Sequence, residues 1–369
     1  MGDWSRLPKK LLEMIAAELE DCIVDYIQFG AVCSSWRSIA VEKRHQINSQ
    51  TPWLLFPISP IEKTHYDSYT RPDKKTRYGL LNLSNEKVYF LDLPKEISNT
   101  HFCIGAYQSW LLMSDEDNMS FLLNPFTGSQ VQIPWKKIAV LSVSKFVFSS
   151  SLATHTMEED FTVMAIHGSK KKLAFCKPGD ENWTRIEGDN DPYVDLMYYE
   201  GQFYALDQNG GVIVVCFGGP SPSTKLIKIQ EAGSSSRYHL DYNYLVGSCG
   251  KLLLVKRIYN MDQTIGFKVF ELDTSNRELV EVSQLGDRVL FVGDNFSTSI
   301  LSLNSSKCRG NCIYFADYYK KFPLVFHDIA AFDLCDTSIE HLRYGRGVLD
   351  IGTSFLQGEA VWVTPSPCF

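Results

Sequence analysis

Cys308 and Cys312 are the residues of this chain whose type and spacing come closest to a metal site. They lie four positions apart, and His327 follows further along the same region. A structural zinc ion takes four Cys or His ligands, commonly supplied as two closely spaced pairs. The chain has no second pair at a similarly tight spacing. We therefore predict that it binds no metal and that both cysteines are buried or lie in a turn.

Acidic pairs and one glycine-containing segment are the other candidates for chemistry. Glu158–Glu159 and the pair Asp189/Asp191 could act as general acids and bases only in a pocket that shifts their pKa values. Their polar surroundings favour solvated loops instead. The segment Tyr344–Gly352 has paired glycines but neither the spacing nor the preceding strand of a dinucleotide site. Since hydrolase, phosphate-loop and metalloprotease motifs are also absent from the sequence, we predict no catalytic residue, no cofactor and no enzymatic activity.

Composition and charge narrow the class of protein. The 369 residues are 44% hydrophobic and 13% aromatic, enough for a sizeable core, and the net charge is −7. The basic residues form short, scattered clusters, whereas a nucleic-acid binder would gather them on one face. The sequence contains no secretory signal and no run of roughly 20 apolar residues that could span a membrane. We expect the ten cysteines to be reduced and the protein to be cytoplasmic, nuclear or both, with no nucleic-acid or membrane partner.

The first 40 or so residues have the period of helices. Pro8 suits the first turn of a helix. Four side chains of that helix fall within about 100° of one another on a 3.6-residue wheel: Leu11, Leu12, Ile15 and Leu19. A second helix is predicted over Cys22–Gln28, and a third from Phe29 through Ala40, with Phe29, Val32, Cys33 and Trp36 as its apolar stripe. So small a bundle cannot hide all these side chains. They must pack either on another protein or on the rest of this chain, and the pattern alone favours neither.

From about residue 52 the chain has the pattern of strands and turns. Segments starting at Gly201, Gly250 and Gly310 each combine a glycine, an apolar strand, a polar turn and a second apolar strand. Their irregular steps are close to the roughly 40–50 residues of one propeller blade. We predict a mainly β fold with a small α head: a three-helix domain at 1–46, then a β-propeller-like domain of six or seven blades at 52–369. A stack of β-sandwiches is the competing architecture.

The segments "WSRLPKKLLEMIAAEL" and "YIQFGAVCSSWRSIA" resemble an F-box, whose pattern is Leu-Pro, two leucines, an aliphatic helix and then Val-Cys-x-x-Trp-Arg. The β part resembles the kelch-like domain that follows the F-box in a large plant family of Skp-interacting partners. The segments "LLNPFTGSQVQIP", "YEGQFYALDQNGGVIVV", "YLVGSCGKLLLVKR" and the terminal "WVTPSP" carry that similarity.

The resemblance implies that the head binds a Skp-type adaptor, and through it a cullin, while the β domain binds an unknown target protein. The chain would then be the non-catalytic substrate-recognition subunit of a Skp–cullin–F-box ubiquitin ligase. The adaptor-binding residues implied are Leu7, Pro8, Leu11, Leu12, Ile15, Leu19, Val32, Cys33 and Trp36. Leu12 and Phe29 could instead hold the helices together.

Two other functions stay open at this point. One is a propeller enzyme or carbohydrate-binding propeller, which needs a cluster of catalytic or sugar-stacking residues at the propeller mouth. The other is an F-box scaffold without a ligase role. By length and polarity, the segments expected to recognise a target are Ser114–Met119, Thr154–Asp160, Gly218–Ser236 and Asn260–Thr264.

Overall fold

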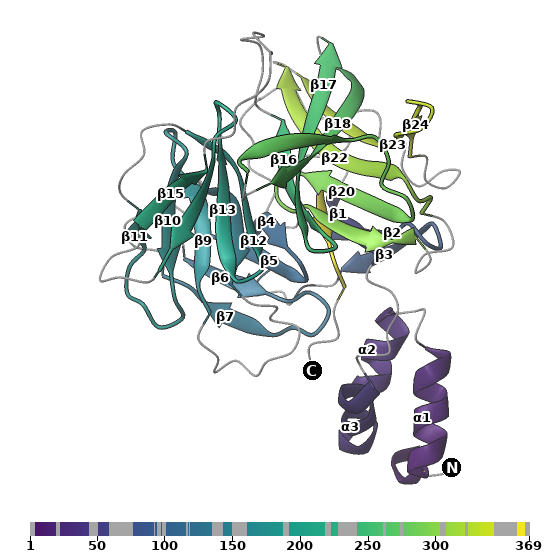
Figure 1. Ribbon diagram of the computed structural model, residues 1–369. Helices are drawn as coiled ribbons and strands as arrows, with labels where there is room; N and C mark the ends of the chain where they lie inside the picture. The colour runs from purple at the N-terminus through teal and green to yellow at the C-terminus, as the bar shows by residue number, and fades with distance from the viewer. Residues whose placement is uncertain are drawn as a thin grey trace.

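In the computed structural model, a helical head is joined to a ring of six β-sheets (Figure 1). The structure describes residues 4–19, 23–43, 51–58, 77–91, 93, 97, 101–115, 117, 119–134, 143–149, 161–186, 192–217, 223–227, 242–260, 263–273, 276–302, 308–321, 324–342 and 360–365. Among the helices in these ranges, none is long and apolar enough to span a lipid bilayer.

Five of the six sheets have four antiparallel strands each. The first sheet joins β25 (Val361–Val363), β1 (Trp53–Ile58), β2 (Arg77–Asn82) and β3 (Lys87–Leu91). The second consists of β4 (Phe102–Tyr107), β5 (Trp110–Ser114), β6 (Ser120–Leu123) and β7 (Gln130–Gln132). The third consists of β8 (Val143–Phe148), β9 (Val163–His167), β10 (Lys172–Cys176) and β11 (Thr184–Arg185). The predicted propeller is confirmed, and the blade count is six.

The fourth blade consists of β12 (Tyr193–Tyr199), β13 (Gln202–Asp207), β14 (Val212–Cys216) and β15 (Ser223–Ile227). The fifth consists of β16 (Asn243–Ser248), β17 (Lys251–Asn260), β18 (Gln263–Asp273) and β19 (Glu278–Val282). The sixth has five strands in the order β21 (Thr298–Leu301), β20 (Arg288–Gly293), β22 (Cys312–Lys321), β23 (Leu324–Asp333) and β24 (Ile339–His341). It also contains one parallel pair, β20 with β22.

The glycines that marked the repeats serve the turns between inner strands. Glu200 and Gly201 join β12 to β13 with φ of 46° and 82°, and Cys249 and Gly250 join β16 to β17 with φ of 51° and 73°. Two-residue hairpins need positive φ at both central positions to match the twist of the strands, and glycine adopts it without a steric cost. The third marker, Gly310, precedes β22 instead, because the sixth blade has a different strand order.

The ring closes by pairing the two ends of the β domain. Trp53, Leu54 and Leu55 of β1 lie opposite Val363, Trp362 and Val361 of β25, so the first blade contains strands from both ends. A closed ring leaves fewer exposed strand edges than an open stack of sheets. This pairing excludes the alternative of stacked β-sandwiches.

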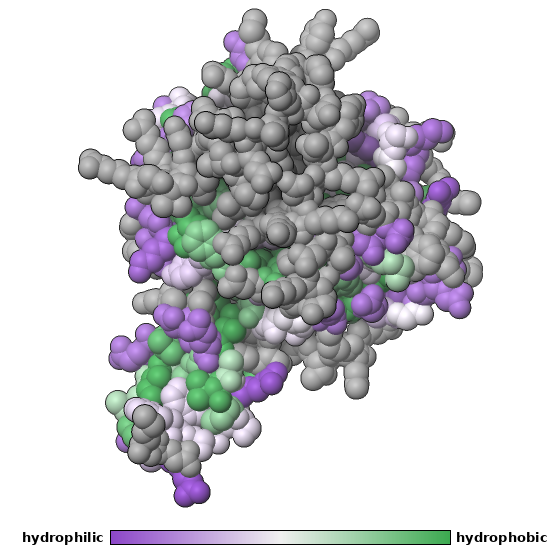
Figure 2. Space-filling model, turned by 180° about the vertical axis from the view of Figure 1, so that it is seen from behind, coloured by the Kyte–Doolittle hydropathy of each residue, from purple (hydrophilic) through white to green (hydrophobic). Residues whose placement is uncertain are grey.

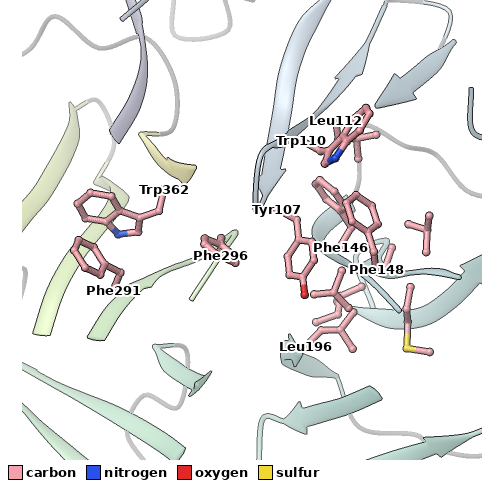
Figure 3. Packing of buried hydrophobic residues seen from close by; sticks show 14 of the residues in the cluster. Tyr107, Trp110, Leu112, Phe146, Phe148, Leu196, Phe291, Phe296 and Trp362 are labelled. Atoms are coloured by element: carbon pink, nitrogen blue, oxygen red, sulfur yellow. The ribbon is translucent and has the colours of Figure 1, made fainter. Parts of the chain in front are cut away.

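Aromatic side chains fill the interior around the inner strands (Figure 3). Phe296 follows β20 and lies with its ring centroid 5.4 Å from that of Tyr107 on β4. Trp362 packs on Phe291 at 5.1 Å, and its indole N–H donates to the carbonyl oxygen of Val292 at 3.0 Å. All four rings are buried. This part of the interior is therefore a packed aromatic core.

The head consists of a short 3-10 turn, η1 (Trp4–Arg6), and three helices, α1 (Lys9–Glu18), α2 (Ile23–Ala31) and α3 (Ser34–Lys43). The predicted start of the third helix is wrong. Phe29 belongs to α2, and Val32 and Cys33 are non-helical residues that separate α2 from α3. Gly30, a poor helix former, lies one residue before the end of α2. The amide of Val32 bonds the carbonyl of Phe29 at 3.3 Å, a tight closing turn.

Candidate functional site

The head is held together by a small core of its own. The buried side chains are Leu12, Ala16, Ile23, Tyr26, Phe29, Ile39 and Ala40. The hydroxyl of Tyr26 donates to the carbonyl oxygen of Ala40 at 2.9 Å, which ties α2 to α3. These side chains belong to one apolar cluster with residues of the first two blades, so packing as well as the linker attaches the head to the propeller.

The outer surface of the head is also apolar. Trp4 is 67% exposed, Leu11 45%, Met14 58% and Val32 53%. Figure 2 shows hydrophobic residues gathered over this part of the molecule. Exposed apolar side chains normally occur singly on a protein surface, and a group of them marks an interaction site. We call Trp4, Leu11, Met14 and Val32, with the half-buried Trp36, the head surface.

Trp36 is held in place from inside the head. Its ring lies 4.8 Å from that of Phe29, and its indole N–H donates to the backbone carbonyl oxygen of Trp4 at 3.0 Å. The indole is therefore fixed while part of it stays accessible. A large aromatic ring presented in a fixed orientation is typical of an energetic centre in a protein interface.

The structure divides the nine predicted adaptor-binding residues into three groups. Pro8, Leu11 and Val32 are exposed, and Leu7, Ile15, Leu19, Cys33 and Trp36 are half-buried. Leu12 is 2% exposed and lies in the core of the head. The burial of Leu12 supports the other role that the sequence left open for it, which is to hold the helices together. α1 thus has an inner face with Leu12 and Ala16 and an outer face with Leu11 and Met14.

Trp4 and Met14 are absent from the residues predicted from the sequence. Met14 could have been found from its position three residues after Leu11, on the same side of the helix. Trp4 precedes the helix and had no periodicity to identify it. Only the hydrogen bond from Trp36 shows that it belongs to the head surface.

In the part of the chain that the structure describes, no zinc ligands gather around Cys308 and Cys312. Both cysteines are buried, as predicted, and neither forms a disulfide bond. Cys312 lies opposite Asp333 in the β22–β23 hairpin, whereas His327 lies opposite Tyr318, six residues further along. Burial raises the pKa of the Cys312 thiol to about 11, so it is protonated near neutral pH and a poor ligand. Across the described residues, no three His, Cys, Asp or Glu side chains meet as a metal site requires.

A cavity of about 800 Å³ lies where the sixth blade meets the first. Its lining residues are Leu83, Glu86, Cys308, Arg309, Tyr314, Ala331, Ile339, Glu340, His341 and Leu342. The guanidinium of Arg309 bonds the carboxylate of Glu340 at 2.9 Å, so these two charges neutralise each other. The cavity is thus lined by apolar and polar side chains together, and its ion pair is open to solvent, since the side chains of Arg309 and Glu340 are 55% and 69% exposed.

The segments predicted to recognise a target differ in what the structure shows of them. In Ser114–Met119, between β5 and β6, the Asp115 carboxylate accepts from the amides of Asp117 and Met119. Thr154–Asp160 lies outside the described residues, as do residues 218–222 and 228–236 of Gly218–Ser236. The loop prediction is wrong at Ser223–Ile227, which form β15 because Val212–Cys216 of β14 provides a pairing edge. Of Asn260–Thr264, Asn260 ends β17 and pairs with Gln263, which begins β18.

Comparison with known proteins agrees with this architecture. The family model of the KIB1-4 beta-propeller matches residues 80–333, more than half of the chain. F-box protein SKIP23 of Arabidopsis thaliana is 29% identical over 85% of this chain and 84% of its own length. An F-box/kelch-repeat protein of the same plant is 26% identical over 98% of this chain and 94% of its own length. The chain therefore belongs to the KIB1-4 beta-propeller family, and its helical head and propeller are consistent with its similarity to plant F-box proteins.

Proposed function

We propose that this protein is the substrate-recognition subunit of a Skp–cullin–F-box ubiquitin ligase. The head surface binds a Skp-type adaptor, which links the chain to a cullin, and the propeller binds the target protein. Other subunits carry out ubiquitin transfer, so this chain contributes position and not catalysis: a target lysine held beside the charged conjugating enzyme reacts as if within one molecule. Such a subunit would work in the cytoplasm, the nucleus or both.

The observation that carries this proposal is the exposure of Leu11, Met14 and Val32 on the same small helical head that holds the ring of Trp36 in place. Fully burying an exposed aliphatic side chain is worth roughly 1.5–3 kcal/mol, and each of these side chains, about half exposed, would contribute about half of that. The sequence had left open whether the β domain covers them. In the described part of the chain Leu11 is not covered by strands, and Trp36 is covered in part by Phe29 of the head itself. Their exposure supports a partner in another chain.

Surface variants of the full-length protein test adaptor binding. Leu11→Asp and Val32→Asp place a charge on the head surface without opening its core, since both side chains are about half exposed. We expect the affinity for a purified Skp-type adaptor, measured by calorimetry, to fall at least thirtyfold, the effect of about 2 kcal/mol at an interface centre. Val280→Asp, which is 52% exposed on β19, is the matched control and should bind as the wild type does.

Unchanged affinity of the double variant would disprove the assignment of the head surface. A ligase role is tested separately, in plant cells with the proteasome blocked. Proteins captured by the wild type and by Val280→Asp should accumulate and carry ubiquitin. If they carry none while adaptor binding is intact, the protein is an F-box scaffold without a ligase role.

A further inference from the structure

Two strands of the fifth blade project beyond their sheet. β16 pairs with β17 only as far as Lys256, and β19 pairs with β18 only as far as Val269. The remaining residues, 257–260 of β17 and 263–268 of β18, have each other as their strand partners in the described structure, with a bulge between Ile258 and Tyr259. The amide of Arg257 also donates to the carbonyl oxygen of Tyr242 at 3.2 Å. We call residues 256–260 and 263–268 the ribbon. In Figure 1 it extends from the side of the propeller opposite to the helices.

The ribbon is held rigidly from one side. The guanidinium of Arg257 lies over the rings of Tyr242, at 4.8 Å, and Phe315, at 5.7 Å. Its Nε donates to the hydroxyl of Thr264 across the ribbon at 2.7 Å. The ring of Tyr259 packs edge-on against Tyr242 at 5.4 Å. Since these contacts fix the ribbon before any ligand binds, little conformational entropy is lost on binding.

The other side of the ribbon is apolar and positively charged. Ile258 is 38% exposed and Ile265 is 55% exposed. Lys256 lies directly opposite Lys268, an arrangement in which like charges repel, and its ammonium lies over the ring of Phe270 at 5.1 Å. The carboxylate of Glu281 approaches Lys268 only to 3.9 Å, and the side chains of both residues are more than half exposed. A lysine pair can protect a strand edge from aggregation, but that role does not explain two exposed isoleucines beside it.

We propose that the ribbon binds an extended segment of the target protein that combines acidic and apolar side chains. Carboxylates of the segment relieve the repulsion between Lys256 and Lys268, and its apolar side chains cover Ile258 and Ile265. A positive patch on a chain of net charge −7 would select such a segment from others. This inference rests on the proposed function in one respect, that the propeller binds a target protein. It does not depend on the adaptor.

The test uses a fluorescein-labelled ten-residue peptide that alternates Glu and Val, and a second peptide that alternates Lys and Val. Fluorescence anisotropy with the full-length protein should show binding of the acidic peptide that weakens with added salt. Ile258→Ser with Ile265→Ser should weaken it at least tenfold. Phe90→Ser, 61% exposed on β3 of the first blade, is the control and should leave affinity unchanged.

Charge-reversed variants distinguish a loss of the binding surface from a loss of the folded structure. Lys256→Glu with Lys268→Glu should lose the acidic peptide and gain the basic one, which an unfolded variant cannot do. Should the isoleucine pair unfold the blade, the more exposed Ile265→Ser alone provides the same measurement. The proposal is overturned if the wild type binds neither peptide, or if the charge-reversed protein keeps its preference for the acidic peptide.

The two proposals fail separately. Leu11→Asp with Val32→Asp should abolish adaptor binding and leave the peptide affinity unchanged, while the ribbon variants should keep the adaptor. If the wild type does not bind the peptide but binds the adaptor, the ribbon proposal is therefore wrong and the proposed adaptor binding is unaffected.

Discussion

Asp195 and Lys145 form an ion pair in the interior of the ring, where both side chains are almost fully buried. The Asp195 carboxylate also accepts hydrogen bonds from the amides of Leu196 at 2.8 Å and Leu245 at 2.5 Å, so it joins the inner strands of blades three, four and five. Burial raises the pKa of Asp195, and the neighbouring ammonium of Lys145 opposes that rise. A buried pair of this kind is costly to break, because the remaining charge has no water around it.

We predict that Lys145→Met destabilises the protein by about 3–5 kcal/mol, because it leaves the Asp195 carboxylate buried without its counter-charge. The double variant with Asp195→Leu should recover much of this loss. Lys251→Met removes an exposed ion pair with Glu271 and should cost no more than about 1 kcal/mol. Urea denaturation followed by tryptophan fluorescence measures all three, and an equal cost for Lys145→Met and Lys251→Met would refute the prediction.

At the scale of single elements, the outer and inner faces of α1 have different roles although their residues alternate along the chain. Leu12 is in the core of the head, and its neighbour Leu11 is on the head surface. A 3.6-residue period turns adjacent side chains by about 100°, which is enough to separate them. The same helix therefore stabilises the head and presents the surface that we assign to the adaptor.

Substitutions at two adjacent positions of α1 should accordingly affect different properties, the stability of the head at one position and adaptor binding at the other. Leu12→Ala opens a cavity and should destabilise the head by about 2–5 kcal/mol, seen as faster hydrogen exchange of the α2 and α3 amides in the full-length protein. Leu11→Ala should leave the exchange rates unchanged and weaken adaptor binding. If Leu11→Ala also accelerated exchange in α2 and α3, Leu11 would belong to the core of the head and not to its surface.

Considered as a whole, the molecule places its two proposed binding surfaces on opposite sides of a closed ring. The head lies beside β3 in Figure 1, and the ribbon projects from the far side. The ring depends on β25, whose Trp362 is 1% exposed and bonds the sixth blade through Val292. The distance between the two proposed binding surfaces is therefore set by the closed propeller, and opening the ring would change it.

Truncation of the last strand should open the propeller. A chain ending at residue 359 lacks β25 and should lose protection against proteolysis in the first and sixth blades together. Trp362→Ala, which keeps the strand pairing, should cost about 3–5 kcal/mol. A chain ending at Pro365 keeps β25 and is the control. Wild-type resistance of the shorter chain to trypsin would show that β25 is not required for closure.

The sequence by itself determined the division into a helical head and a β domain, the F-box pattern and the glycine-containing hairpin turns. These features are local: they depend on side-chain periods of 3.6 and 2 and on backbone conformations available to glycine. The predicted start of the third helix was wrong even so, because the apolar stripe from Phe29 to Trp36 continues from α2 across two non-helical residues into α3.

Only the tertiary structure decided which side chains are buried, and these include charged as well as apolar ones. Lys145 and Asp195 each follow a bulge, Val143/Lys145 and Tyr193/Asp195, and a one-residue change of register reverses the side of a strand to which a side chain points. The pairing of β1 with β25 and the length of the ribbon depend on strands that are distant in the chain. Which residues remain exposed on the head and on the ribbon follows from that long-range packing, which no local pattern encodes.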